Sequence, residues 1–113
     1  MRRRVRDVEQ QLTVLNRRMR QLKEQTRQVR GWHFALQACV KHGRESVTLR
    51  WRYRLGWNAM WERDIEPSLG MFPVELQTWY RRANMAAAIL NVQERCLRYE
   101  RLALKRLLER LRE

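Results

Sequence analysis

The sequence predicts an α+β protein that is mainly α-helical. We expect two long antiparallel helices, at about 3–30 and 73–112, with a β-hairpin and a short helix inserted between them. Three observations predict this fold: a heptad repeat in the first thirty residues, an alternation of apolar and polar residues over 47–55, and a stretch of about forty residues after Pro73 without glycine or proline. At 113 residues, the whole chain (1–113) is expected to be a single domain.

The first helix is predicted by apolar residues that recur at alternating spacings of three and four. This seam consists of Val5, Val8, Leu12, Leu15, Met19, Leu22, Thr26 and Val29. The pattern predicts a helix about 40 Å long, capped at its C-terminus by Gly31. Such a seam requires a second helix to pack against. Parallel pairing of two copies would set Arg18 against Lys23, so an antiparallel partner, inside or outside the chain, is favoured.

The hairpin is predicted by two alternating runs. In the segment VTLRWRYRL, one face carries Val47, Leu49, Trp51, Tyr53 and Leu55, and the other carries Thr48, Arg50, Arg52 and Arg54. The preceding run alternates as well, and a short segment containing Gly43 joins the two. We therefore expect strands at about 32–41 and 46–55. The alternative, in which 32–41 continues the first helix, fits the alternation less well.

A short helix is expected at about 57–65, after Gly56 ends the second strand. Trp57 and Trp61 are spaced to share one side of it, and Pro67 is expected to stop it, with a loop over 67–72. The tryptophan pair is expected to pack in the core. The alternative is an exposed platform for stacking bases or binding a partner.

The last helix is predicted to begin at Pro73, a residue favoured in the first turn, with Glu75 close to the positive end of the helix dipole. A broad apolar stripe follows, formed by Leu76, Trp79, Tyr80, Ala83, Ala86, Ala87, Leu90, Leu97, Leu104, Leu107, Leu108 and Leu111. This helix is the natural antiparallel partner of the first.

The charge of the chain predicts an acidic partner. Lys+Arg number 25 against 12 Asp+Glu, a net charge of +13, and nearly all of the positive charge is arginine, whose planar fork grips phosphate. Successive arginines on the hairpin face would lie roughly 6.6 Å apart, two residues of strand rise. The expected nucleic-acid contacts are Arg50, Arg52 and Arg54, with Arg81, Arg82, Arg2, Arg3 and Arg4 as further candidates.

We expect binding that depends steeply on salt, with little sequence specificity and with DNA favoured over RNA. Two alternatives remain open. The arginines could be a solvated face that protects an edge hairpin from aggregation. Otherwise the chain could be a coiled-coil adaptor or structural subunit that docks on an acidic protein surface or self-associates through its helices.

No catalytic or metal-binding pattern is present in the sequence. The serines lack a supporting base, no glycine-rich phosphate loop occurs, and the cysteines and histidines lack metal-ligand spacing. Glu62, Asp64 and Glu66 surround Arg63 and do not suggest a metal site. We therefore predict a protein that is not an enzyme and uses no cofactor or metal. No run of eighteen apolar residues occurs, so no membrane span is expected.

Two short motifs carry a resemblance. Thr48-Leu49-Arg50-Trp51-Arg52 and Leu90-Asn91-Val92-Gln93, within roughly residues 45–100, resemble a domain-of-unknown-function family of small proteins encoded on bacterial integrating conjugative elements, some labelled integrase regulator. The arginine-rich heptad helix departs from that family. The resemblance implies a cytoplasmic bacterial accessory protein of a mobile genetic element that acts at DNA or on a DNA-bound machine. It supplies no active site.

Overall fold

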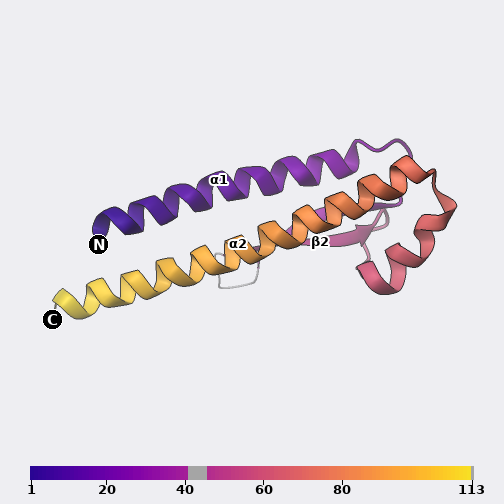
Figure 1. Cartoon of the computed structure of the whole chain (residues 1–113). Coiled ribbons are helices and arrows are strands. Elements are labelled where there is room, and N and C mark those ends of the chain that lie inside the picture. The colour runs from indigo at the N-terminus through magenta and orange to yellow at the C-terminus, as the bar shows by residue number, and fades with distance from the viewer. Residues whose placement is uncertain (41–45, 113) are drawn as a thin grey trace.

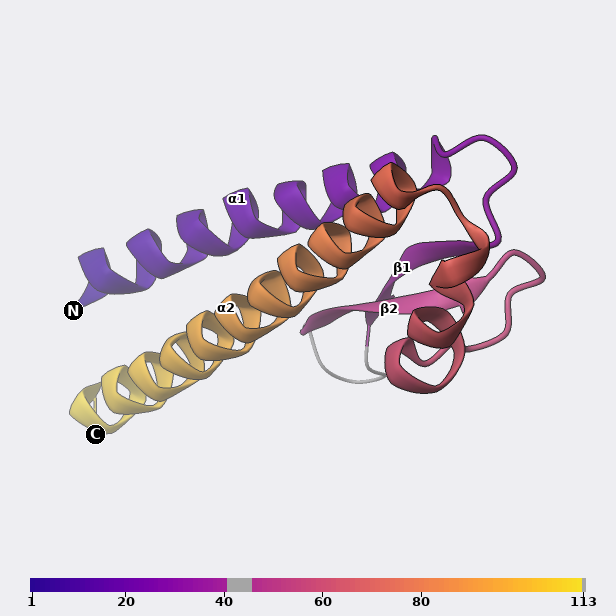
Figure 2. The same ribbon diagram turned by 45° about the vertical axis from the view of Figure 1, so that its right-hand side comes forward.

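The chain folds into an elongated body of 60 × 24 × 20 Å. The structure, a computed structural model, describes residues 1–40 and 46–112. Its elements are α1 (Arg2–Arg27), β1 (Phe34–Val40), β2 (Val47–Tyr53), the short helical turns η1 (Trp61–Ile65) and η2 (Glu66–Met71), and α2 (Val74–Arg112). The predicted fold class is confirmed: two long helices lie antiparallel, with both chain ends together and the hairpin beside their other halves (Figures 1 and 2).

The seam of α1 is used within the chain. Val8, Leu12, Leu15, Met19 and Thr26 are buried, while Val5, Leu22 and Val29 are partly buried. The helix lies against α2 along its length and against β1 at its C-terminal half. The antiparallel partner that the seam requires is therefore the last helix of the same chain.

The end of α1 differs from the prediction. The helix ends at Arg27, with Gln28 as its cap, so the expected extension to residue 30 and the cap at Gly31 are wrong. Gly31 instead has a φ of 67° and lies in the turn that brings β1 back beside α1. The earlier end follows from the hairpin, since Leu36 must approach Thr26 to donate its backbone N–H to the hydroxyl at 3.0 Å.

The two strands form an antiparallel pair in which Leu36 faces Trp51 and Ala38 faces Leu49. The observed β1 excludes a helical continuation over 34–40. Leu36, Leu49 and Trp51 lie in the core. The predicted turn at Gly43 lies outside the described residues.

The free edge of β2 is covered by the chain that follows it. Gly56, with a φ of 94°, reverses the backbone. Residues 57–59 then run back along the strand, so that the Tyr53 N–H donates to the Trp57 carbonyl and the Ala59 N–H to the Trp51 carbonyl. The predicted helix at 57–65 is therefore wrong in its first half, because these strand groups take the backbone bonds that a helix would have used. Helical structure begins only at Trp61.

The segment 67–72, predicted as a loop, is mostly helical, because η2 spans Glu66–Met71. It directly follows η1, near whose start the Asp64 carboxylate accepts the Met60 backbone N–H at 2.7 Å. Pro67 does not stop a helix there, because it lies in the first turn of η2, a position that proline tolerates. Leu69 of η2 is fully buried.

Aromatic side chains fill the core at the hairpin end. Trp61 packs on Trp51 with ring centroids 5.8 Å apart, and Tyr80 of α2 lies 5.9 Å from Trp51. The small residues Ala83 and Ala87 are buried, which allows α2 to approach the strands closely. Burial raises the pKa of the Tyr80 hydroxyl.

Candidate nucleic-acid interface

The outer face of the hairpin carries Arg50 and Arg52, whereas Arg54 follows β2, which ends at Tyr53 and not at residue 55 as predicted. Register pairs Gln37 with Arg50 and Ala35 with Arg52, opposite to the face that packs on the helices. Arg50 is exposed to solvent. The Arg54 guanidinium lies over the Trp32 ring, 5.4 Å from its centroid, in a cation–π contact.

The Arg52 side chain does not extend freely into solvent. It is partly buried, with Nη1 donating to the Gly56 carbonyl at 3.2 Å and Nη2 lying 3.7 Å from the Cys39 Sγ. The Nε atom is buried and has no hydrogen-bond partner in the described part of the chain. Ala35, which faces Arg52 across the hairpin, is only 3% exposed although it is on the outer face. Arg52 is thus held in place, and one of its donors remains unused.

Three arginines converge on one hollow of about 170 Å³. Arg27 reaches it from the end of α1, and Arg52 and Arg54 reach it from β2 and the turn that follows, beside Trp32. No carboxylate is among the described residues that line it. A water molecule occupies roughly 30 Å³ of liquid, so the hollow has room for a group on the scale of a phosphate.

Arg27 and Trp32 are members of this site that were not predicted from the sequence. The predicted helix at about 3–30 has Arg27 close to its C-terminal end, and the predicted strand at about 32–41 begins at Trp32. The signal that could have found them was Gly31, because a turn there returns the chain beside the end of α1 and brings Trp32 to the hairpin.

The other predicted contacts do not join the hairpin arginines. Arg2, Arg3 and Arg4 begin α1 at the far end of the molecule (Figure 1). Arg4 donates to Glu100, with one of the two bonds at 2.8 Å. Arg81 pairs with Glu66 of η2 at 3.0 Å.

Arg82 is exposed on α2. The hollow shared by Arg27, Arg52 and Arg54 does not include it.

A second basic hollow, of about 660 Å³, lies where the start of β2 meets the middle of α2. Its arginines are Arg95, Arg98, Arg101 and Arg106. Arg98 pairs with the buried Glu94 at 3.2 Å, and Arg101 pairs with Glu9 at 3.2 Å. The first pair lies within α2 and the second joins α2 to α1. Because two of its four arginines already pair with carboxylates, the second hollow is less available to an outside anion than the first.

The prediction that Trp57 and Trp61 share one side of a helix is wrong, because the helical turn begins only at Trp61. Trp61 is partly buried against the core, whereas Trp57 is 73% exposed. Trp57 borders an apolar hollow of about 590 Å³ that Arg54 and His33 also line. The core interpretation therefore holds for Trp61, and an exposed aromatic beside an arginine remains available for stacking at Trp57.

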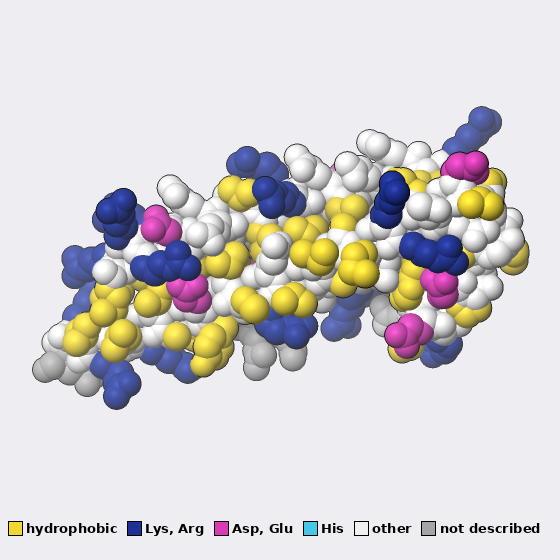
Figure 3. All heavy atoms as spheres, viewed as in Figure 1, with side chains coloured by type: hydrophobic (Ala, Val, Ile, Leu, Met, Phe, Trp, Pro, Cys, Tyr) yellow, Lys and Arg dark blue, Asp and Glu magenta, His cyan; other side chains and the backbone are white. Residues whose placement is uncertain are grey.

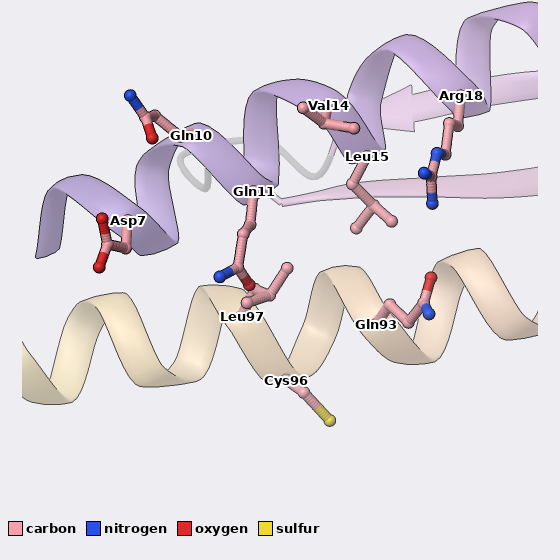
Figure 4. A pocket seen from close by; sticks show the side chains of 9 residues that line it. All are labelled: Asp7, Gln10, Gln11, Val14, Leu15, Arg18, Gln93, Cys96 and Leu97. Carbon is pink, nitrogen blue, oxygen red and sulfur yellow. The ribbon is translucent and has the colours of Figure 1, made fainter. Parts of the chain in front are cut away.

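A further hollow of about 660 Å³ lies between the N-terminal half of α1 and α2 (Figure 4). Gln11, Leu15 and Arg18 reach into the space between the helices, while Cys96 points away from α1. Its lining mixes amides, one acid, one arginine and apolar groups, and it shows no concentration of positive charge.

Neither a metal-binding cluster nor a membrane-spanning helix occurs among the residues that the structure describes. No group of three or more His, Cys, Asp or Glu side chains in residues 1–40 and 46–112 is placed to hold a metal ion. No helix formed by these residues has the length and hydropathy that crossing a membrane requires.

Comparison with known proteins found no matching family model, no matching curated protein and no matching solved structure. The resemblance to the conjugative-element family therefore stays a prediction from two short motifs. In the structure these motifs touch, because the Asn91 side-chain amide bonds to both backbone groups of Leu49.

Proposed function

We propose that the protein binds nucleic acid without catalysis, through the outer face of the hairpin, by gripping the phosphate backbone. What supports the proposal is the convergence of Arg27, Arg52 and Arg54 on one hollow whose described lining contains no carboxylate. Planar guanidinium groups donate paired hydrogen bonds to phosphate oxygens. Arg50 continues the same face along the strand, so several phosphates of one backbone can be contacted together.

Stacking would complement these phosphate contacts. Trp57 is exposed next to Arg54, and an aromatic face stacks on any base without reading its sequence. Single-stranded DNA, whose bases are accessible, is therefore the preferred ligand. Little sequence specificity is expected, since guanidinium contacts to the backbone do not distinguish bases.

The direct test is binding of fluorescently labelled single- and double-stranded oligonucleotides, DNA and RNA, followed by anisotropy across a salt series. Changing Arg50, Arg52 and Arg54 together to Gln is expected to weaken binding by roughly a hundredfold at low salt and to flatten the salt slope by about two to three contacts. Absence of binding by the unaltered protein at low salt would overturn the proposal.

A matched control separates the site from the net charge. Arg6, Arg17 and Arg20 are exposed on α1, and changing all three to Gln removes the same charge elsewhere. The control variant is expected to keep most of the affinity. Equal losses in both variants would show that the overall charge, not the hairpin face, attracts the nucleic acid.

The proposed biological setting is that of a cytoplasmic accessory protein of a bacterial mobile genetic element. That setting is supported by the two-motif resemblance alone, and neighbouring integration or transfer genes would support it further. The alternative, an adaptor that docks through the α1 seam on another protein, is less favoured because that seam is buried within the chain.

A further inference from the structure

A second heptad seam runs along α2 on the side that faces away from the rest of the fold. It consists of Met85, Ile89, Val92, Cys96, Tyr99 and Ala103, at spacings of 4, 3, 4, 3 and 4. All six side chains are exposed, with Met85 62%, Val92 55% and Tyr99 75% exposed. Figure 3 shows hydrophobic side chains gathered along α2 on the face in view.

This seam is distinct from the one that packs inside the molecule. The buried positions Ala83 and Ala87 lie two residues before and after Met85, close to half a turn around the helix. Nothing among the described residues covers the outer seam. A regular 3.5-residue apolar repeat is the pattern that fits another helix of the same period.

We propose that a second copy of this chain covers the seam, so that two α2 helices pair in parallel and in register about a twofold axis. Charge complementarity supports this arrangement. Parallel pairing sets Arg95 of one copy against Glu100 of the other, on both sides of the seam. Arg95 is exposed, and Glu100 keeps part of its carboxylate accessible beside Arg4, with 36% of its side chain exposed.

The flanking positions argue against antiparallel pairing. If the two seams overlapped fully in opposite directions, Arg95 of one copy would face Arg95 of the other, and Cys96 of one copy would face Val92 of the other. In the parallel pair, Leu102 instead meets Leu107 of the second copy and extends the apolar contact. Arg82 and Arg106 occupy the next seam positions at either end, so the seam itself is confined to about 85–103 and Leu107 flanks its C-terminal end.

Cys96 makes the arrangement testable, because it lies at a central position of the seam. With helix axes about 8–10 Å apart and Cα atoms roughly 2.3 Å from each axis, the two Cys96 Cα atoms would lie roughly 5 Å apart. That separation is within the range that a disulfide requires. The chain has one other cysteine, Cys39 on the hairpin, which serves as the control.

The experiment combines sedimentation of the full chain with oxidation by diamide and non-reducing electrophoresis. A concentration-dependent dimer is expected. The Cys39→Ser protein is expected to form a disulfide-linked dimer rapidly, and the Cys96→Ser protein is not. Ile89→Glu is expected to weaken dimerisation by roughly tenfold or more and to prevent the cross-link, since it would bury an unpaired carboxylate.

Arg95→Glu tests the orientation. It replaces two attractive pairs of a parallel dimer with two repulsive ones and is expected to weaken association several-fold. Circular dichroism checks that both exposed substitutions preserve the fold. A monomer at all concentrations would overturn the proposal, as would a dimer that Ile89→Glu leaves intact or one that forms no Cys96 cross-link. Because neither variant alters the hairpin, loss of the dimer is distinguishable from loss of the nucleic-acid site.

Discussion

Thr26 shows how one polar side chain in an apolar seam determines where a helix ends. It is fully buried, donates from its hydroxyl to the Lys23 carbonyl at 2.7 Å, and accepts the Leu36 backbone N–H at 3.0 Å. Because the edge of β1 needs a partner for that N–H, the hydroxyl ties the last turn of α1 to the hairpin. An apolar residue at this position would fill the seam equally well and leave the strand unbonded.

We therefore predict that Thr26→Val, which keeps the shape of the side chain, lowers the free energy of unfolding by about 2 kcal/mol, because the buried Leu36 N–H loses the acceptor that the hydroxyl provides. Urea denaturation followed by circular dichroism measures the change. Thr13→Val is the matched control: the Thr13 hydroxyl bonds only to the Glu9 carbonyl on the exposed side of α1, and a change within about 0.5 kcal/mol is expected. Equal effects at both positions would contradict the assigned role of Thr26.

At the scale of elements, β2 is a strand whose outer edge is satisfied in two ways. Its last part bonds to residues 57–59, and its first part bonds to Asn91 of α2. The Asn91 amide accepts the Leu49 N–H at 2.8 Å and donates to the Leu49 carbonyl at 3.0 Å, as a neighbouring strand would. Both devices block the edge from pairing with another chain. The hairpin is thus fixed to α2 by backbone bonds as well as by Trp51, whose indole N–H donates to Asn84.

We predict that Asn91→Leu lowers the free energy of unfolding by about 2–4 kcal/mol, because two partly buried backbone groups lose their partners at once. Asn91→Asp is expected to cost less, since a carboxylate still accepts from the Leu49 N–H but cannot donate to its carbonyl. Urea denaturation of the unaltered protein, Asn91→Asp and Asn91→Leu is expected to give free energies of unfolding that decrease in that order. Hydrogen exchange at the Leu49 N–H reports local opening of the strand. A Leu variant as stable as the original protein would show that the clamp contributes nothing.

The contrast between predicted and observed elements has a physical cause. Heptad spacing and strict alternation report which side of an element is buried, so the long helices, the hairpin and most of its core face were predictable from sequence. The sequence did not predict the contacts made by Asn91, Thr26 and residues 57–59. These contacts form because backbone groups elsewhere in the fold need hydrogen-bond partners. Arg27 entered the candidate site for the same reason. It depends on where α1 ends, which is set by the hairpin.

At the scale of the whole molecule, ion pairs link the two long helices to each other. Glu9 accepts from Arg101 at 3.2 Å and lies 3.7 Å from Lys105, and Glu100 accepts from Arg4. These pairs neutralise arginines at the end of the rod where the chain termini lie (Figure 1). Arg50 and Arg54 form no ion pair within residues 1–40 and 46–112. Ion pairs also form near the hairpin, from Arg63 to Asp64 and from Arg81 to Glu66. The net charge of +13 thus includes unpaired arginines on the hairpin face, which can attract anions.

This arrangement predicts a loss of stability in acid. The bond from Arg4 lowers the pKa of Glu100, and bonds from Arg63 and then the Met60 N–H lower the pKa of Asp64. Both carboxyls regain their ordinary pKa in the unfolded chain, so the unfolded state binds more protons, and stability falls as the pH drops below about 4. Urea denaturation between neutral pH and about pH 3, at low salt, measures this fall. Glu100→Gln is expected to make the acid limb shallower, because its amide no longer titrates, and an unchanged limb would place the acid sensitivity at other carboxyls.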